Sequence, residues 1–442
     1  MPPLRSILLL LLSLSAGQAA AADLLEIYHA AQSQDAVFAA ARATQRAGYE
    51  KRAQGRSLLL PSISLSANDT LNKSDIRFGG AAAAISPGSQ NYNSYGFGLN
   101  LVQPLYHAEK NIAYSQAELQ VALSETQFNI VKQDLILRVA QAYFDVLAAH
   151  DAVQLGATQK AAISEQLEQA KRNFDVGTAT ITDSYEAQAR YDLVNAQEIA
   201  AQSNLEIKKR AMQQITRSAL GELRPLSPAF KPKALEPTDV ERWVDLAQQS
   251  SLQLASARVN TDLAEQEVAR NRAGHSPTVD LVANYGQSYA NASSLGVANN
   301  ARVSALGVQL NLPLYQGGAI NSKVREAEAN LDRSRDELDS ARRNVTLQTS
   351  QAYLGVVNGL AQVRALQQAL RSGESVLEAS KLGQEVGVRT NLDVLNAQQQ
   401  LYATRRDFYQ AEYNYLLSQL QLKAATGKLS EEDLAVVNQA LY

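Results

Sequence analysis

Apolar residues alternate with polar or small residues along two stretches of the chain, 95–106 and 305–315. The alternating apolar positions are Tyr95, Phe97, Leu99, Leu101, Leu306, Val308, Leu310 and Leu312. Successive side chains of a β-strand point to opposite faces, so this period is typical of a strand with one apolar face. The sequence therefore predicts a strand in each stretch, ending near the shared letters "PLY".

A second alternating piece precedes each of these strands, in "LPSISLSANDTLN" and "SPTVDLVANYGQSY". The residues between the partners are rich in Gly, Ala, Ser and Asn, which favour loops. The sequence therefore predicts two strand pairs, at about 62–105 and about 277–314, with exposed loops near 73–92 and 290–301.

Two long tracts without proline follow the strands, from Pro104 to Pro225 and from Pro313 to the last residue. In the first tract, apolar and weakly polar positions recur in steps of three and four, the period of an α-helix. Those positions are Leu119, Leu123, Thr126, Ile130, Asp134, Leu137, Gln141 and Phe144. The sequence predicts long helices at about 108–175 and 318–385, each roughly 100 Å long at 1.5 Å per residue. Such helices require lengthwise packing against others.

Both long helices break at a glycine, Gly177 in "VGTATITD" and Gly387 in "VGVRTNLD", 210 positions apart. Glycine commonly ends a helix because it adopts the left-handed backbone without a Cβ penalty. New helices are then expected at about 182–220 and about 390–426.

Polar residues precede each new helix. Thr180 is expected to cap the first and Asn391 the second, by accepting hydrogen bonds from the first backbone N–H groups. Asp183 and Asp393 then fall in the first turn, where the helix dipole favours a negative charge. The local pattern alone thus predicts two well-made helix turns.

The matching strand pairs, long helices and breaks indicate an internal duplication. The predicted organisation is a signal peptide (1–22), a first repeat (23–220), a connector (221–238), a second repeat (239–429) and a C-terminal tail (430–442). The connector contains four prolines in "GELRPLSPAFKPKALEP", so it is expected to be irregular. The tail contains "SEEDL", which predicts a capped helical turn.

The N-terminus has the features of a secretory signal peptide: Arg5, an apolar run and the small residues Ala19 to Ala22. No later run approaches the roughly 20 apolar residues that a transmembrane helix needs. The chain has no cysteine, which excludes a disulfide framework, and its net charge of −3 is spread along the chain. An exported chain of this kind suits the envelope of a Gram-negative bacterium, and no nucleic-acid patch is indicated.

Exported strands with one apolar face point to a lipid bilayer, which does not tolerate open sheet edges. Four strands cannot close a barrel by themselves; two chains would give eight strands with a filled interior, and three would give twelve with room for a lumen. Passage of solutes favours three chains. The long helices would bundle into a hollow cylinder in the same assembly. The predicted fold class is therefore an α+β membrane channel in which each chain contributes four strands.

Three segments carry a family resemblance: "LPLYQGG" (312–318), the paired breaks (174–183 and 385–397) and "YNYLLSQLQLKAATGKL" (413–429). On these residues the chain resembles the TolC family of trimeric outer-membrane efflux and type I secretion channels, from residue 23 to the C-terminus. The resemblance implies a homotrimer with a 12-stranded β-barrel in outer-membrane lipid and an antiparallel coiled-coil barrel of 12 helices across the periplasm. Connector and tail form an equatorial collar in that family.

The resemblance also implies partners and a gate. A periplasmic adaptor and an inner-membrane pump of the ABC or RND type open a periplasmic tip that is closed at rest. In this family an arginine after the second glycine, here Arg389, bonds to the aspartate of the first break, here Asp183. A tyrosine commonly joins this lock, and Gln384 stands at its position, so the lock is weaker or the Gln384 amide substitutes.

A pair of aspartates three residues apart lines the narrowest point of the tunnel in this family. Asp393 matches the first of them and Asn396 the second. Glu186, three residues after Asp183, is a further candidate for the negative field. The sequence therefore predicts cation selectivity that is weaker than with two full rings.

An enzyme is not indicated, because the four histidines (His29, His107, His150 and His275) are scattered and no nucleophile or phosphate-loop spacing occurs. Metal-ligand spacing is also absent, so no cofactor is expected. The alternative function is a periplasmic coiled-coil adaptor or scaffold without a pore. That alternative would not explain two strand pairs interrupting the helical repeat.

Overall fold

The computed structural model describes residues 22–218, 221–295 and 297–442, so the predicted signal peptide lies outside the described residues up to position 21. The chain divides into two compact units. One comprises Met1–Ala43, Gln127–Ala255 and Ser340–Tyr442, and the other Thr44–Thr126 and Ser256–Asp339. None of the helices in the described part of the chain combines the length and apolarity needed to cross a membrane.

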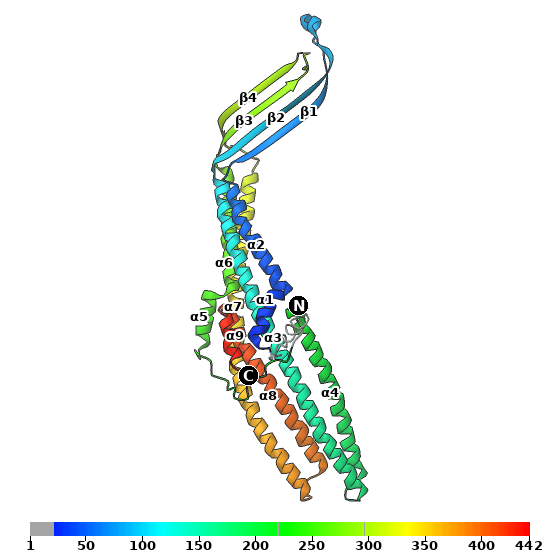
Figure 1. The fold of residues 1–442 in the computed structure, drawn as a ribbon. Coiled ribbons are helices and arrows are strands. Elements are labelled where there is room, and N and C mark those ends of the chain that lie inside the picture. Colours follow the sequence, from blue (N-terminus) through cyan, green and yellow to red (C-terminus); the bar gives the residue numbers. More distant parts are fainter. Residues whose placement is uncertain (1–21, 219–220, 296) are drawn as a thin grey trace, which may run out of the picture. The chain divides into compact units, whose positions relative to one another are not determined.

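Helices make up most of the first unit, and the four strands of the described residues all belong to the second (Figure 1). In chain order the elements are α1 (Leu24–Gln34), α2 (Ala36–Ser57), β1 (Ser62–Ile76), β2 (Gly88–His107), α3 (Ala108–Asp175), α4 (Ile181–Thr216), α5 (Val240–Ser250), α6 (Leu252–Arg272), β3 (Thr278–Ala290), β4 (Asn299–Asn311), α7 (Ala319–Glu385), α8 (Asn391–Ala425) and α9 (Glu431–Asn438).

The four strands form one antiparallel sheet in the order β1-β2-β3-β4. Cross-strand pairs place Leu65 opposite Leu99 and Leu99 opposite Tyr285. Directly opposite residues point to the same face of a sheet, so the alternating apolar positions join into one apolar face. Much of that face is exposed, as with Ile63 at 64% and Leu306 at 75%. The predicted face of β2 is therefore confirmed and extends over all four strands.

The opposite face of the sheet is polar or small. Ser64 pairs with Asn100, Asn100 with Asn284 and Asn284 with Ala305, so amides and hydroxyls follow one another across the sheet. Within this sheet, β1 and β4 each have one neighbour and are its two edges. The sheet thus has an apolar side, a polar side and two edge strands.

The strand ends differ from the sequence-based expectation. The connection between β1 and β2 is shorter than the expected loop and contains a 3₁₀ helix at Gly80–Ile85. β2 continues past Pro104 to His107, the residue before α3, with a register shift at the proline, which has no N–H to pair. β4 instead ends at Asn311, and Gly317 and Gly318 adopt positive φ before α7. The two "PLY" segments therefore have different structures.

In the unit that contains the sheet, α2 and α3 approach closely along small residues. A Cβ atom at Gly48 would collide with Ser124, and one at Gly55 would lie 2.5 Å from the Cβ of Ala117. The glycines and their partners are each seven residues apart, two helical turns, so they form one contact line. The helices can pack this closely only because these side chains are absent or small.

The core of the other unit gathers residues of α1, α3, α8 and α9 around Tyr28, Tyr143 and Tyr415, which are fully buried. On α3 the buried positions span a wide arc: Leu135, Ile136, Val139, Ala140, Tyr143, Phe144, Val146 and Leu147. The helical period was predicted correctly, but the predicted contact positions Asp134 and Gln141 are exposed. α3 is covered from more than one side here, so no narrow stripe identifies its buried face.

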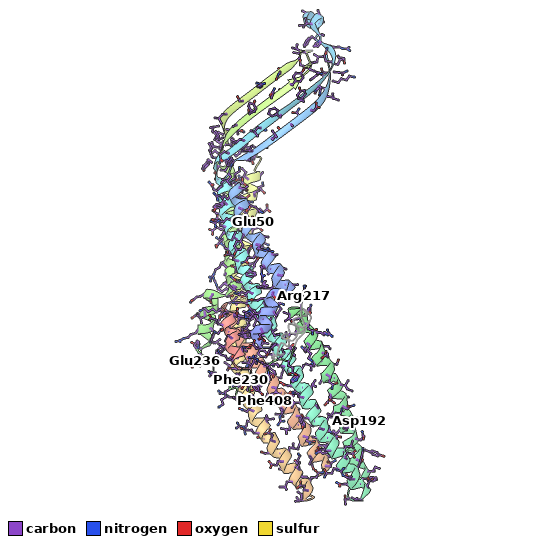
Figure 2. The ribbon with its side chains drawn as sticks, in the orientation of Figure 1. Glu50, Asp192, Arg217, Phe230, Glu236 and Phe408 are labelled. Carbon is purple, nitrogen blue, oxygen red and sulfur yellow. The ribbon has the colours of Figure 1, made fainter. Side chains whose placement is uncertain are left out.

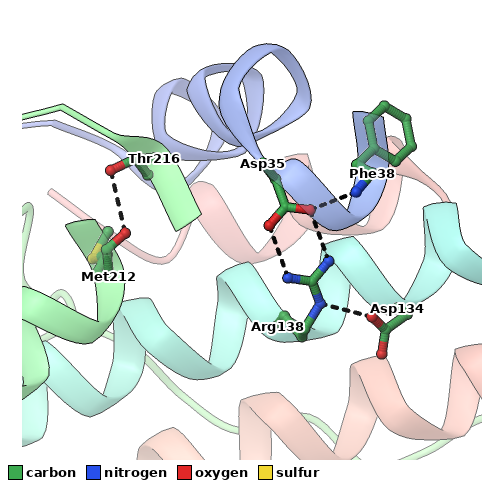
Figure 3. Close-up of polar contacts among 6 residues, drawn as sticks. All are labelled: Asp35, Phe38, Asp134, Arg138, Met212 and Thr216. Carbon is green, nitrogen blue, oxygen red and sulfur yellow. Dashed lines mark hydrogen bonds and ion pairs between the residues drawn. The ribbon is translucent and has the colours of Figure 1, made fainter. Parts of the chain in front are cut away.

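A buried ion pair fixes the junction between α1 and α2 (Figure 3). Asp35 ends α1 and accepts the N–H of Phe38 at 2.7 Å. Both of its carboxylate oxygens also accept hydrogen bonds from the guanidinium of Arg138 on α3, at 3.0 and 3.2 Å. Arg138 contacts Asp134 with its Nε at 2.7 Å. One arginine thus anchors the break between two helices to a third helix.

The connector and the tail are attached to the same core. Short bridges pair Ala22 with Leu223 and Leu226 with Leu441. Phe230 of the connector and Phe408 of α8, both labelled in Figure 2, pack against the core. The tail forms α9, and a capping box at Ser430 begins it.

Candidate functional site

The two helical hairpins α3–α4 and α7–α8 end in nearly identical turns at the lower end of the view in Figure 1. Gly177 and Gly387 have φ of 76° and 80°. The N–H of each glycine donates to the carbonyl three residues earlier. The N–H of the following residue donates to the carbonyl five residues earlier, from Thr178 to Asn173 and from Val388 to Gly383. This hydrogen-bond pair is the Schellman motif, which satisfies the last carbonyls of a helix. Both glycines end their helices as predicted.

The helices that follow both begin with a reciprocal capping box. Thr180 N–H donates to Oδ2 of Asp183 at 2.9 Å, and the N–H of Asp183 donates to Oγ1 of Thr180 at 3.3 Å. Thr390 and Asp393 repeat the arrangement at 2.9 and 3.2 Å. The cap of α8 is therefore Thr390, and the prediction of Asn391 was wrong by one residue. Both residue types cap well, and the Schellman turn places the third residue after glycine at the cap in both hairpins.

Asp393 is held ionised by its surroundings. Hydrogen bonds from the backbone and then the hydroxyl of Thr390 lower the pKa of Asp393, and Arg389 contributes less. Nη1 of Arg389 lies 3.9 Å from Oδ1, on the oxygen that the cap does not use. Thr390 therefore occupies one carboxylate oxygen of Asp393, and the other faces Arg389.

The side chain of Arg389 lies back over the end of α7. A Cβ at Gly383 would come within 2.6 Å of the Cγ of Arg389, so only a glycine leaves room for this path. Gln384, the next residue, donates its amide to Oδ1 of Asn391 at 3.3 Å. Arg389 and Gln384 thus both bridge the turn within their own hairpin.

The structure does not bring Asp183 and Arg389 together within the single chain, among the residues it describes. Oδ2 of Asp183 is taken by Thr180, and the bonds found to Asp183 leave its Oδ1 to a further partner. Glu186 is partly buried on α4, and the described residues offer it no hydrogen bond or ion pair. The lock between the two hairpins stays a prediction about the assembled protein.

Asn396 has a partner that the sequence did not suggest. Nη2 of Arg190, on α4, donates to Oδ1 of Asn396 at 2.8 Å, and Nη1 donates to Oε1 of Gln399. A buried cluster beside this contact joins α3, α4 and α8 through Leu167, Ala187 and Leu395. Nothing in a single sequence indicates that α4 packs on α8 at this height, so Arg190 and Gln399 could not be selected from the pattern.

An antiparallel sheet with an exposed apolar face, joined in each repeat to a long helical hairpin, is the architecture of an outer-membrane channel protein. A family model described as "Outer membrane efflux protein" matches residues 27–216 and 243–428. The chain belongs to this family. It is located in the outer membrane and has a large periplasmic part.

Individual relatives agree with the family. Outer membrane protein TolC of Vibrio cholerae is 34% identical over 426 residues, which cover 95% of this chain and 94% of that protein. Alkaline protease secretion protein AprF of Pseudomonas aeruginosa is 33% identical over residues that cover 94% of this chain and 87% of that protein. The CmeC outer membrane channel of Campylobacter jejuni has the same fold, with a TM-score of 0.79 at 16% identity over 95% of this chain and 90% of that one.

Proposed function

We propose that three copies of this chain assemble into an exit duct that crosses the outer membrane and extends through the periplasm. The duct receives drugs, other small molecules or exported proteins from an inner-membrane pump and releases them outside the cell. Its periplasmic tip, formed by the α3–α4 and α7–α8 turns, is closed at rest.

The sheet carries this proposal. Its apolar face is exposed in the single chain, as with Leu65 at 71% and Val308 at 65%, and lipid is the environment that favours such a face. Its edge strands β1 and β4 have unpaired backbone groups, which neighbouring copies would satisfy by closing a barrel of twelve strands. A pore-free periplasmic adaptor would leave both the apolar face and the edges without a role.

The gate rests on the twin turns. In the assembled duct, Arg389 pairs with the free oxygen of Asp183, so that the two hairpins hold each other at the tip. The guanidinium is available for this, because its side chain is 59% exposed and its contact with Asp393 is long. Gln384 supports the turn through its hydrogen bond to Asn391. It does not replace the hydroxyl of the tyrosine that commonly stands at its position in the family.

Selectivity rests on Asp393, three copies of which form one acidic ring at the constriction. Asn396 adds no charge to that ring, and Glu186, one helical turn before Arg190 on α4, adds a further negative field. The duct is therefore cation-selective, and less so than a duct with two acidic rings.

Partners follow from the relatives. AprF is named for the secretion of a protease, and the family model is named for efflux. The duct accordingly works with a periplasmic adaptor and an inner-membrane pump of the ABC or RND type, and the pump determines whether the cargo is a protein or a small molecule. The chain itself has no catalytic role.

The deciding experiment is reconstitution of the purified full-length protein in planar lipid bilayers. We expect small single-channel steps with cation preference, and fractionation with the outer membrane after carbonate washing as heat-modifiable trimers. Release by carbonate, with no conductance at any applied voltage, would support the pore-free adaptor.

A further inference from the structure

Arg190 joins two helices near the proposed gate. It lies on α4, two residues before Asp192, which is labelled in Figure 2. Its guanidinium donates to the side-chain oxygens of Asn396 and Gln399 on α8. These acceptors are three residues apart and share one face of their helix. The planar fork of an arginine presents separate N–H groups to both acceptors in a fixed geometry, which the single ammonium group of a lysine does not.

The position of Arg190 is fixed by the packing around it. Ala187 and Val194, three residues before and four after it, are buried at 0% and 3% exposure and mark the same face of α4. Both belong to the cluster with Leu395 of α8. The guanidinium therefore lies at the edge of a packed contact between helices, where its hydrogen bonds resist separation of α4 from α8.

The charge of Arg190 has no ion-pair partner among the described residues, and Glu186, four residues before it on α4, offsets that charge only at longer range. Its two acceptors are neutral amides, and no carboxylate of the described residues lies within ion-pair distance of it. Asn396 is only three residues from Asp393. A positive charge at this height opposes the negative field of the acidic ring.

We propose that Arg190 is a positioning and selectivity residue of the gate. Its hydrogen bonds to Asn396 and Gln399 hold α4 and α8 together in the closed state, and its charge weakens the cation preference set by Asp393. This inference rests on the proposed function, in which this end of the helical hairpins is the closed entrance.

The pairing changes what position 396 does. An aspartate there would form an ion pair with Arg190, which strengthens the α4–α8 contact and neutralises the charge of Arg190. Asn396→Asp alone should therefore raise the cation-to-anion permeability ratio about as far as Arg190→Gln does, but should lower the open probability instead of raising it. In the Arg190→Gln background, the same substitution should increase cation preference strongly.

The test is single-channel recording on the full-length protein in bilayers, with an asymmetric KCl gradient to measure the cation-to-anion permeability ratio. Arg190→Gln should raise the open-to-closed ratio about tenfold, the factor expected for loss of one charge-assisted hydrogen bond, and should raise the permeability ratio. Arg190→Lys keeps the charge and loses the fork, so it should open the channel more and leave the permeability ratio as in the wild type. If Arg190→Gln fails to form trimers, Arg190→Lys still tests whether the paired hydrogen bonds of Arg190 restrain opening.

Arg210→Gln is the matched control. Arg210 also lies on α4, but its side-chain bond among the described residues is to Gln213 of its own helix, at 3.2 Å. The inference is overturned if Arg190→Gln conducts like the wild type, if Arg210→Gln has an equal effect, or if Arg190→Lys shifts the permeability ratio as far as Arg190→Gln. Failure of the proposed function is distinct, because the wild-type protein would then show no channels at all.

Discussion

The hydroxyl of Thr390 donates to the carboxylate of Asp393 at 2.8 Å, and the backbone N–H of each residue donates to the side-chain oxygen of the other. Thr180 and Asp183 make the same set of bonds in the other hairpin. Asp393 is thus a helix cap as well as the proposed gate charge. A substitution there changes both properties, and an experiment must separate them.

Asp393→Asn should lower the cation-to-anion permeability ratio markedly, because it removes the proposed ring of three carboxylates. Asp393→Glu should keep most of the preference, since it retains the charge. The permeability ratio in a salt gradient measures this. Thr390→Ala is the control for the cap, because it weakens the same capping box and leaves the carboxylate of Asp393 in place, and an equal loss of selectivity in that variant would contradict the assignment to the charge of Asp393.

The pH dependence of selectivity follows from the lowered pKa of Asp393. Because Thr390 and Arg389 stabilise the charged form, the ring should remain ionised at every pH above the ordinary aspartate value of about 4. Cation preference should therefore be constant between about pH 7 and 5 and should decline only as the pH falls through the lowered pKa. A midpoint near pH 6 in the permeability ratio would show that another group sets the selectivity.

Gly387→Ala should destabilise the protein by about 1–2 kcal/mol, because alanine at a φ of 80° is strained. No atom lies within 4 Å of the position that the new Cβ would occupy, so strain alone would cause the loss. Thermal unfolding in detergent measures it. Gly156→Ala, at a helical glycine of α3 with room for a Cβ, should instead be neutral or stabilise by up to about 1 kcal/mol. Equal effects of the two substitutions would contradict the turn geometry.

Arg389→Ala should raise the open probability if Arg389 restrains the gate. Gly383→Ala should act in the same direction without touching the charge, because its Cβ would come within 2.6 Å of the Cγ of Arg389 and displace that side chain. Single-channel recordings compare the two. Gly373→Ala on the same helix, where the nearest atom is a flexible Leu401 methyl at 3.4 Å, is the control. A normal channel with Gly383→Ala would mean that the observed path of Arg389 is not needed for closure.

The sequence predicted the features that depend on local periodicity. Alternation along β2 gave the apolar face, and the absence of proline gave the long helices. Gly387 marked the turn because a left-handed backbone conformation strongly favours glycine. The prediction of Asn391 as cap missed by one residue because Thr390 and Asn391 are both good capping residues, and only the path of the turn distinguishes them.

Contacts between distant segments could not be predicted in the same way. Arg190 and Asn396 are 206 positions apart, and their pairing depends on which faces of α4 and α8 meet. The buried arc of α3 was also not recoverable, because Phe144 and Val146 point to nearly opposite sides of the helix and both are covered. Weakly amphipathic helices of this kind leave their orientation to tertiary packing.

Asp35→Asn should destabilise the protein by about 3–5 kcal/mol, because it leaves the α1–α2 junction without the charge that Arg138 and the Phe38 N–H require. Asp35 is 4% exposed. Burial alone would raise the pKa of Asp35, but the Arg138 bonds lower it below the usual value. Asp134→Asn removes the other, exposed partner of the same arginine and should cost less than about 1 kcal/mol. Chemical denaturation of the two variants compares them, and similar losses would refute the special role of the buried pair.

Glu412→Gln should stabilise the protein at pH 8 by about 1–3 kcal/mol. Glu412 of α8 is buried, and burial together with the nearby charge of Asp151 raises its pKa to about 7. Asp151 is bonded by the hydroxyl of Tyr413 at 2.6 Å, whereas Glu412 has no cation beside it among the described residues.

The folded protein therefore holds a proton on Glu412 that the unfolded chain releases near pH 4.5. The contribution of Glu412 to stability is largest below that value and is lost as the pH rises to about 7. Glutamine keeps the neutral form at every pH, so the gain in the free energy of unfolding should grow from about pH 5 to 7 and then level off. Denaturation of wild type and variant at pH 5 and pH 8 measures this gain, and a difference independent of pH would mean that Glu412 is ionised in the folded protein throughout.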